Sequence, residues 1–213
     1  MASTRKNGVL LLTSISSLHP TSPELALCHF LDQYGFSPLV ACPQEGSLSS
    51  RLCEMGIQVK VIPGISRWRN LKGRLFVPWI IKEICTFVPQ YQVVLVHSAR
   101  MSTTPSAVKV AHHLGVPCIS HIHGVPRDPG KFRRYLVHEA DTVIGVSKAA
   151  LAQYSPAERQ EVAVVYNGLD IEAFRHRGNE FDARARSGLT GNFIVGMSGA
   201  YQLKGLDVLV DAA

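Results

Sequence analysis

The sequence predicts a doubly wound α/β domain, Rossmann-like and built on a mostly parallel sheet. Short runs rich in Val, Ile and Leu recur along the chain, and segments with helical spacing separate them. The runs lack strict polar alternation, which indicates strands covered on both faces. Helices that cross between parallel strands supply that cover, with right-handed crossovers. The predicted strands are 8–13, 38–41, 57–62, 93–97, 117–121, 142–146, 162–166 and 193–197.

Two of the intervening segments carry clear helix boundaries. Ser22 is a suitable N-cap, Pro23 fits the first helical position, and Gly35 ends the segment. In the same way Pro105 opens and Gly115 closes a second segment whose apolar residues share one face. These boundary residues support the alternation of strands and helices on which the fold prediction depends.

The pattern divides the chain into three parts. Residues 1–172 form the predicted N-terminal domain. Residues 173–192, where charged residues and glycine dominate, are the predicted linker. Residues 193–213 contain a new strand and a helix with an apolar face but no capping signal at its end. We therefore expect 193–213 to be the truncated start of a second domain.

Composition favours a globular protein with anionic partners. Hydrophobic residues make up 46% of the chain and charged residues 18%, so the chain can bury one full-sized core. The formal net charge of +6 favours nucleotide diphosphates, phospholipid headgroups or nucleic acid. Because no nucleic-acid-binding motif is present, we expect no nucleic-acid partner.

The cysteines and the hydropathy pattern indicate the cellular compartment of the protein. Five cysteines, an odd number without any Cys-x-x-Cys pair, argue against a disulfide framework and favour a reducing compartment. The apolar run 9–12 is too short for a signal peptide, and Lys82, Glu83 and two prolines interrupt the most apolar stretch, 76–96. We expect a cytoplasmic protein, with peripheral contact to the inner face of the membrane left open.

The first predicted strand leads into a polar loop that contains Ser16 and Ser17. Ligands of doubly wound sheets bind beyond the carboxyl ends of the strands, so these serines are cleft candidates. The amides at the start of the following helix could hold an anion, although an ordinary connecting loop is the simpler interpretation. The loop lacks the glycine pattern of dinucleotide-binding enzymes and the lysine pattern of P-loop enzymes.

Two histidines mark the end of the fifth predicted strand. Strand alternation places His121 and His123 on the same side, and Gly124 would allow a backbone or ligand to come close. The pair could hold a metal ion, but no third ligand is identifiable, so hydrogen bonding is the better interpretation. His112 and His113 lie on a predicted helix and are expected to be surface or packing residues.

Two further features leave alternatives open. Basic and aromatic residues between Arg67 and Trp79 form either a solvated face or an amphipathic element that contacts a membrane or an acceptor. The pair Asn167-Gly168 is the usual signature of a tight hairpin turn, but its neighbours point to another role.

Those neighbours belong to an ordered set of motifs that resembles glycosyltransferase family 4. The resemblance extends over residues 9–213. Its motifs are Ala-Asp-Thr-Val-Ile-Gly-Val-Ser at 140–147, Val-Tyr-Asn-Gly-Leu-Asp at 165–170 with Phe174, and Gly199 with Lys204-Gly205.

The resemblance implies a GT-B enzyme, in which two Rossmann-like domains face a cleft. Such an enzyme transfers a sugar from a nucleotide donor with retention, usually without a metal ion, so no cofactor is expected. His123 matches the family's active-site histidine, and Lys204, with Gly199, matches the site that holds the donor diphosphate. Ser147 and Asn167 are the remaining cleft candidates, and 193–213 becomes the start of a C-terminal nucleotide-sugar-binding domain.

The chain departs from the family pattern at several points. The glycine pair of the first loop is absent around 21–24, Ala200 replaces an arginine, and the spacing to Lys204 is short. The paired glutamates that hold the nucleotide sugar would lie beyond Ala213, so we expect this fragment alone to be inactive.

Two functions follow as hypotheses. The first is a retaining hexosyltransferase that modifies a glycan or lipid-linked acceptor in cell-surface polysaccharide or glycolipid synthesis. The second is a non-catalytic module that binds a sugar or phosphoglycan on the same scaffold, because fold alone does not establish function.

Overall fold

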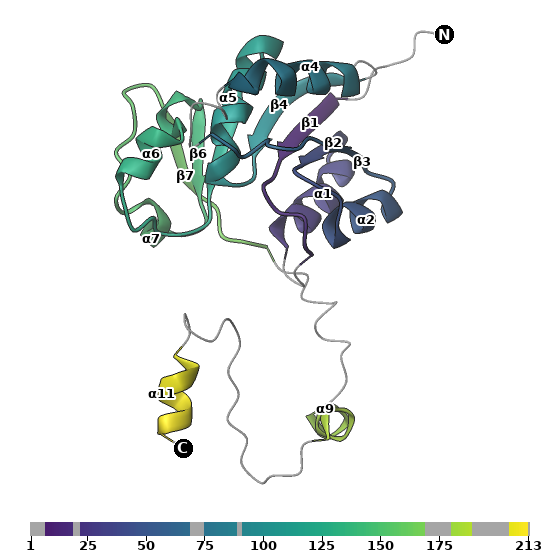
Figure 1. Ribbon diagram of the computed structural model, residues 1–213, viewed down its shortest axis with the longest axis vertical. Coiled ribbons are helices and arrows are strands. Elements are labelled where there is room, and N and C mark those ends of the chain that lie inside the picture. Colours follow the sequence, from purple (N-terminus) through teal and green to yellow (C-terminus); the bar gives the residue numbers. More distant parts are fainter. Residues whose placement is uncertain are drawn as a thin grey trace. The chain divides into compact units, whose positions relative to one another are not determined.

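The computed structural model describes residues 7–18, 22–68, 75–88, 91–168, 180–188 and 205–212 (Figure 1). The chain divides into two compact units, Met1–Leu169 and Asp170–Ala213, and each is considered by itself. The predicted boundary at 172 and the predicted strand 193–197 lie outside the described residues, so the domain limits stay predictions. In the second unit the structure describes helices α9 (Glu180–Ser187) and α11 (Leu206–Asp211).

The first unit is built on a parallel sheet, which confirms the predicted doubly wound fold. Seven strands have the order β3-β2-β1-β4-β5-β6-β7, and every described pairing is parallel. The order reverses between β1 and β4, which is where ligands bind in this architecture. The strands are β1 (Asn7–Leu12), β2 (Phe36–Cys42), β3 (Gln58–Val61), β4 (Gln92–Ser98), β5 (Cys118–Ile122), β6 (Thr142–Gly145) and β7 (Glu161–Val164).

Helices cover the two faces of the sheet. Helices α1 (Pro23–Gln33) and α2 (Ser47–Glu54) pack on the face that carries Val9 and Leu11. Helices α4 (Val77–Phe87) and α5 (Thr104–Leu114) pack on the opposite face. The short elements are η1 (Met101–Thr103), α6 (Gly130–Arg134), η2 (Val137–Glu139) and α7 (Lys148–Leu151). Among the described segments, no helix is long and apolar enough to cross a membrane.

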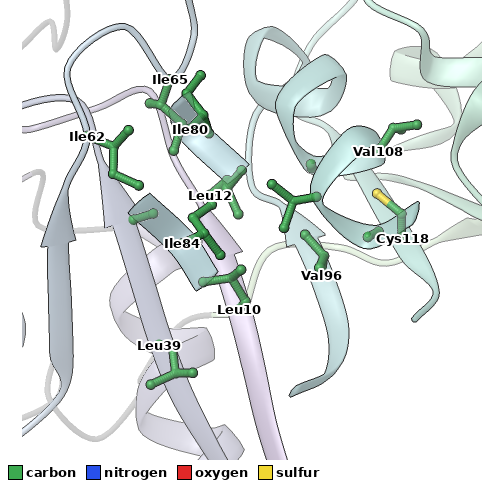
Figure 2. Close-up of a cluster of buried hydrophobic side chains, with 14 of the residues drawn as sticks. Leu10, Leu12, Leu39, Ile62, Ile65, Ile80, Ile84, Val96, Val108 and Cys118 are labelled. Carbon is green, nitrogen blue, oxygen red and sulfur yellow. The ribbon is translucent and has the colours of Figure 1, made fainter. Parts of the chain in front are cut away.

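The largest core lies between the sheet and α4–α5. Figure 2 shows Ile80 and Ile84 of α4 in the same cluster as Leu10 and Leu12 of β1, and each of these side chains is at most 1% exposed. Full burial of one such side chain contributes about 1.5–3 kcal/mol. This packing anchors β1 at the centre of the sheet.

The predicted helix boundaries hold to within a residue. Helix α1 begins at Pro23, and Gly35 follows its end with a φ of 79°. Helix α5 begins at Thr104, one residue before Pro105, and ends on Gly115, whose φ of 68° is in the left-handed region that glycine adopts without strain.

Buried hydroxyl groups join the carboxyl ends of β1, β4 and β5. Ser98 Oγ lies 2.9 Å from Thr103 Oγ1 and 3.1 Å from Thr104 Oγ1, and Thr104 Oγ1 lies 2.8 Å from Ser120 Oγ. Thr103 Oγ1 also donates to the Leu12 carbonyl at 3.0 Å. A connected network of this kind holds the strand ends in one arrangement.

The loop after β1 is held against the start of α2. The Leu48 amide donates to the Ser16 carbonyl at 3.0 Å, and Gln44 Nε2 donates to Ser16 Oγ at 3.1 Å. A Cβ atom at Gly46 would overlap the Ser16 carbonyl oxygen and lie 3.1 Å from its carbon. Position 46 therefore needs glycine for this close approach.

We expect Gly46→Ala to lower the free energy of unfolding by about 1–3 kcal/mol, because backbone rather than a flexible side chain must shift. Chemical denaturation measures this change. The matched control is Gly124→Ala, where an added Cβ meets no atom within 4 Å, so its change should stay within about 0.5 kcal/mol. Equal stabilities of the two variants would contradict the packing at Gly46.

Candidate functional site

A pocket of about 340 Å³ lies where the strands of the first unit end. Helix α1 forms one wall and the carboxyl ends of β4 to β7, with their following loops, form the other. The wall from α1 consists of Pro23, Glu24, Ala26, Leu27 and Phe30. The opposite wall consists of His97, Ala99, His121, His123, Ile144, Val165, Tyr166, Asn167 and Gly168. The pocket occupies the edge of the sheet at which the sequence placed the candidate site.

Three histidines form a row along the inner wall. The register between β4 and β5 pairs His97 with Ile119, so His97, His121 and His123 share one face of the sheet. The rings of His97 and His121 stack with centroids 5.4 Å apart and an interplanar angle of 24°. The centroids of His121 and His123 are 4.2 Å apart. The prediction that His121 and His123 point to the same side is confirmed, whereas His97 was not recognised from the sequence.

The environment keeps these imidazoles neutral. Burial, with the neighbouring His121 and His123, lowers the pKa of His97 from 6.5 to about 3. Burial and His123 lower the pKa of His121 to about 4, although Glu24 opposes the shift. For His123, burial and the Arg100 guanidinium lower the pKa to about 4 against a hydrogen bond to the Ala99 backbone. Each ring therefore offers one N–H donor and one lone pair at neutral pH.

Two ring nitrogens in this row are buried without a partner. Within the described residues, neither His97 Nε2 nor His121 Nε2 has a hydrogen-bond partner, and His97 is only 6% exposed. A buried polar atom left unsatisfied costs about 1–3 kcal/mol. A ligand group that bonds to these nitrogens would remove that cost, so they are the strongest sign of a binding function in the pocket.

An ion pair between a buried glutamate and a partly buried arginine lies near the histidine row. Glu24, in the first turn of α1, is 2% exposed and pairs with Arg100, which follows β4. Arg100 Nε lies 3.0 Å from Glu24 Oε1, and Nη2 lies 3.4 Å from Oε2. Thr13 Oγ1 donates to Glu24 Oε1 at 3.2 Å. This pair could not be predicted from the sequence, because nothing local links residues that are 76 positions apart.

A second, more polar pocket of about 600 Å³ adjoins the first. Ser14, Ser16, Ser17, Ser22 and Arg100 line it, as does Ile15. Pro23, His123 and Asn167 line both pockets. The structure thus brings together five of the predicted residues, namely Ser16, Ser17, His121, His123 and Asn167.

The other predicted residues do not join this group. Gly124 is exposed and lines neither pocket, and Ser147 is the N-cap of α7, where its side chain accepts the Ala150 amide at 3.1 Å. Gly199 and Lys204 lie outside the described residues. His112 and His113 are exposed on α5, as expected.

Two alternatives from the sequence can be narrowed. Asn167 and Gly168 follow β7 and both line the pocket, which supports a role other than a turn, although the residues after 168 that a hairpin would need lie outside the described residues. In the part of the chain that the structure describes, no group of three His, Cys, Asp or Glu residues is placed to hold a metal ion.

The described geometry agrees with comparisons to known proteins. The family model of Glycosyltransferase Family 4 matches residues 25–173, which is more than half of the chain. The chain therefore belongs to this family. A comparison with curated protein sequences finds no match.

Solved glycosyltransferase structures share the fold. HepE from Anabaena, crystallised with UDP, has a TM-score of 0.70 and 22% identity, over 96% of this chain and 57% of its own. A glycosyltransferase from Rickettsia africae ESF-5 has a TM-score of 0.66 and 18% identity, over 88% and 51%. MurG from Acinetobacter baumannii has a TM-score of 0.55 and 16% identity, over 81% and 50%. The chain thus has the Rossmann-like fold of GT-B enzymes and spans just over half the length of HepE.

We expect Glu24→Gln to lower the free energy of unfolding by about 1.5–3 kcal/mol, because it weakens charged hydrogen bonds to a buried carboxylate. The matched control is Glu54→Gln, whose pair with Arg51 is exposed, with side chains 62% and 54% accessible. Exposed pairs contribute about 0–1 kcal/mol. If chemical denaturation shows equal losses in the two variants, Glu24 has no special structural role.

The lowered pKa values predict a pH-dependent stability. Between about pH 6.5 and 4 the three histidines of the row become protonated in the unfolded chain and not in the folded chain, so stability should fall as pH falls. Each such histidine contributes about 1.4 kcal/mol per pH unit to this slope. We expect His97→Phe to reduce the slope by about that amount and exposed His112→Phe to leave it unchanged. Denaturation curves at pH 7, 6, 5 and 4.5 measure it, and parallel profiles would contradict the neutral state of His97.

Proposed function

We propose that this chain is the acceptor-side part of a retaining hexosyltransferase that uses a nucleotide-sugar donor. The observation that carries the proposal is the position of His123, which borders both the apolar pocket and the serine-lined pocket. A neutral imidazole at such a boundary can hydrogen-bond the donor sugar or polarise the reacting centre without adding a charge.

The donor side of the proposal rests on the family resemblance. Lys204, with Gly199, is assigned to the donor diphosphate, because a lysine ammonium stabilises the negative charge that develops as the nucleoside diphosphate leaves. In this scheme lysine does the work that a metal ion does in other transferases, so no cofactor is included. HepE has been crystallised with UDP, with UDP-glucose, and with UDP and glucose, which supports a nucleotide-sugar partner.

The acceptor and the location are part of the same proposal. We assign a glycan or lipid-linked acceptor in cell-surface polysaccharide or glycolipid synthesis, and a cytoplasmic site at the inner face of the membrane. All five cysteines are free thiols, which suits a reducing compartment. Leu75, Phe76 and Trp79 at the start of α4 are exposed, and Phe76 packs edge-on against Trp79, which suits contact with a membrane surface.

A second candidate function is a non-catalytic binding module for a sugar or phosphoglycan. One observation favours it: residues of the first unit alone form both pockets. Saturable binding of a glycan to this chain, with no transfer by the complete protein that contains it, would select this alternative.

The decisive assay measures sugar transfer from radiolabelled UDP-sugars by the complete protein. We expect His123→Ala to lower kcat at least about 100-fold, the lower range for loss of an acid, base or polarising group. Its thermal unfolding should stay within a few degrees of the parent. The control is His112→Ala on the exposed side of α5, which should retain normal turnover. Near-normal turnover of His123→Ala would remove the catalytic assignment.

A further inference from the structure

The unpaired nitrogens in the apolar pocket define the kind of group that the pocket can hold. His97 Nε2 and His121 Nε2 are buried, lack partners within the described residues, and belong to rings whose centroids are 5.4 Å apart. A hydrogen bond to an imidazole nitrogen lies in the plane of the ring, so each of the two stacked rings presents its own bonding direction. A hydroxyl group suits either nitrogen, because it can donate to a lone pair or accept from an N–H.

Part of the pocket lining is aliphatic and offers no hydrogen bond. Ala26 and Leu27 on α1 face Ile144 and Val165 across the pocket, and none of these side chains has a hydrogen-bonding group. A methyl group of a ligand would be stabilised there, whereas a second hydroxyl would lose its bonds to water without replacement. The site therefore selects a hydroxyl beside an apolar substituent.

The same residues argue against a hydrocarbon occupant. An acyl or polyprenyl chain in the pocket would cover His97 Nε2 and His121 Nε2 and leave both without a partner. A volume of about 340 Å³ is also at the lower end of the range of ligand pockets, which suits one ring rather than a long chain.

The side of the pocket that adjoins the second pocket is polar. His123 and Asn167 lie at the boundary with the second pocket, which is lined by serines and Arg100. The remaining hydroxyls of a sugar ring would face these groups and water. The ligand that fits both regions has one apolar edge, one hydroxyl beside that edge, and polar groups elsewhere.

We propose that this pocket is an acceptor subsite for a 6-deoxy sugar, whose methyl group packs against Leu27 and Ile144 and whose neighbouring hydroxyl hydrogen-bonds to His97 or His121. The proposal rests on the proposed function, since it identifies the acceptor of that transfer. A 6-deoxy sugar differs from its parent sugar only by the oxygen on C6, so a pair of glycosides can test the proposal directly.

The test compares glycosides that differ only in the oxygen on C6. The probes are methyl α-L-rhamnoside against methyl α-L-mannoside, and methyl α-L-fucoside against methyl α-L-galactoside. We expect the 6-deoxy member of at least one pair to bind this chain at least about tenfold more tightly, in a titration followed by NMR. The imidazole resonances of His97 and His121 should shift on binding, and those of exposed His112 should not.

Two variants test the two proposed contacts, namely the hydrogen bond to a histidine and the apolar contact of the methyl group. His97→Phe removes one of the unpaired nitrogens and should weaken binding of the 6-deoxy glycoside about tenfold or more, whereas His112→Phe should bind it normally. Ala26→Ser places a hydroxyl in the apolar wall with little change in volume. Ala26→Ser should reduce the preference for the 6-deoxy member of a pair. This variant tests the proposal independently if His97→Phe fails to fold.

Other outcomes would overturn the proposal. They are equal binding of both members of each pair, no binding of either, or tighter binding of a phenol such as 2-naphthol than of any glycoside. The transfer assay on the complete protein separates this from the proposed function. A preference for 6-deoxy glycosides without transfer would leave the subsite standing and remove the enzyme assignment. Transfer without a preference for 6-deoxy glycosides would support the enzyme assignment and remove the proposed subsite.

Discussion

The parallel pairing of β1 with β4 is the constraint on which the rest of the structure depends. It reverses the strand order and brings the ends of β1, β4 and β5 to one edge of the sheet. The buried hydroxyls of Ser98, Thr103 and Thr104 fasten that edge, and Glu24 joins it to the first turn of α1 through Arg100. Both pockets lie at this edge of the sheet, next to the strand ends that the hydroxyl network and the ion pair hold in place.

The histidine row shows how burial produces a neutral but polar wall. A single imidazole at a surface titrates near neutral pH, but three rings packed together in an apolar setting resist protonation. Such a wall discriminates by the number and position of hydrogen bonds rather than by charge. This property suits the recognition of neutral ligands such as sugars, for which charge gives no distinction.

Sequence reasoning succeeded where the determinants are local and failed where they depend on register. Pro23 and Gly115 mark helix boundaries by their own backbone preferences, and His121 and His123 share a face through strand alternation. His97 joins them only through the pairing of β4 with β5, and Glu24 meets Arg100 only after β1 and β4 pair. Ser147 was expected in the cleft, and its local role as a helix cap was missed.

The pairing of Glu24 with Arg100 has an electrostatic consequence for ligand capture. These are the charged side chains that line the two pockets, and each neutralises the other. This pair therefore contributes little to any field that would draw an anion into the pockets from a distance, and the remaining charges of the chain would have to supply it. Association of a neutral ligand here should depend little on ionic strength, with the rate set by diffusion and fit.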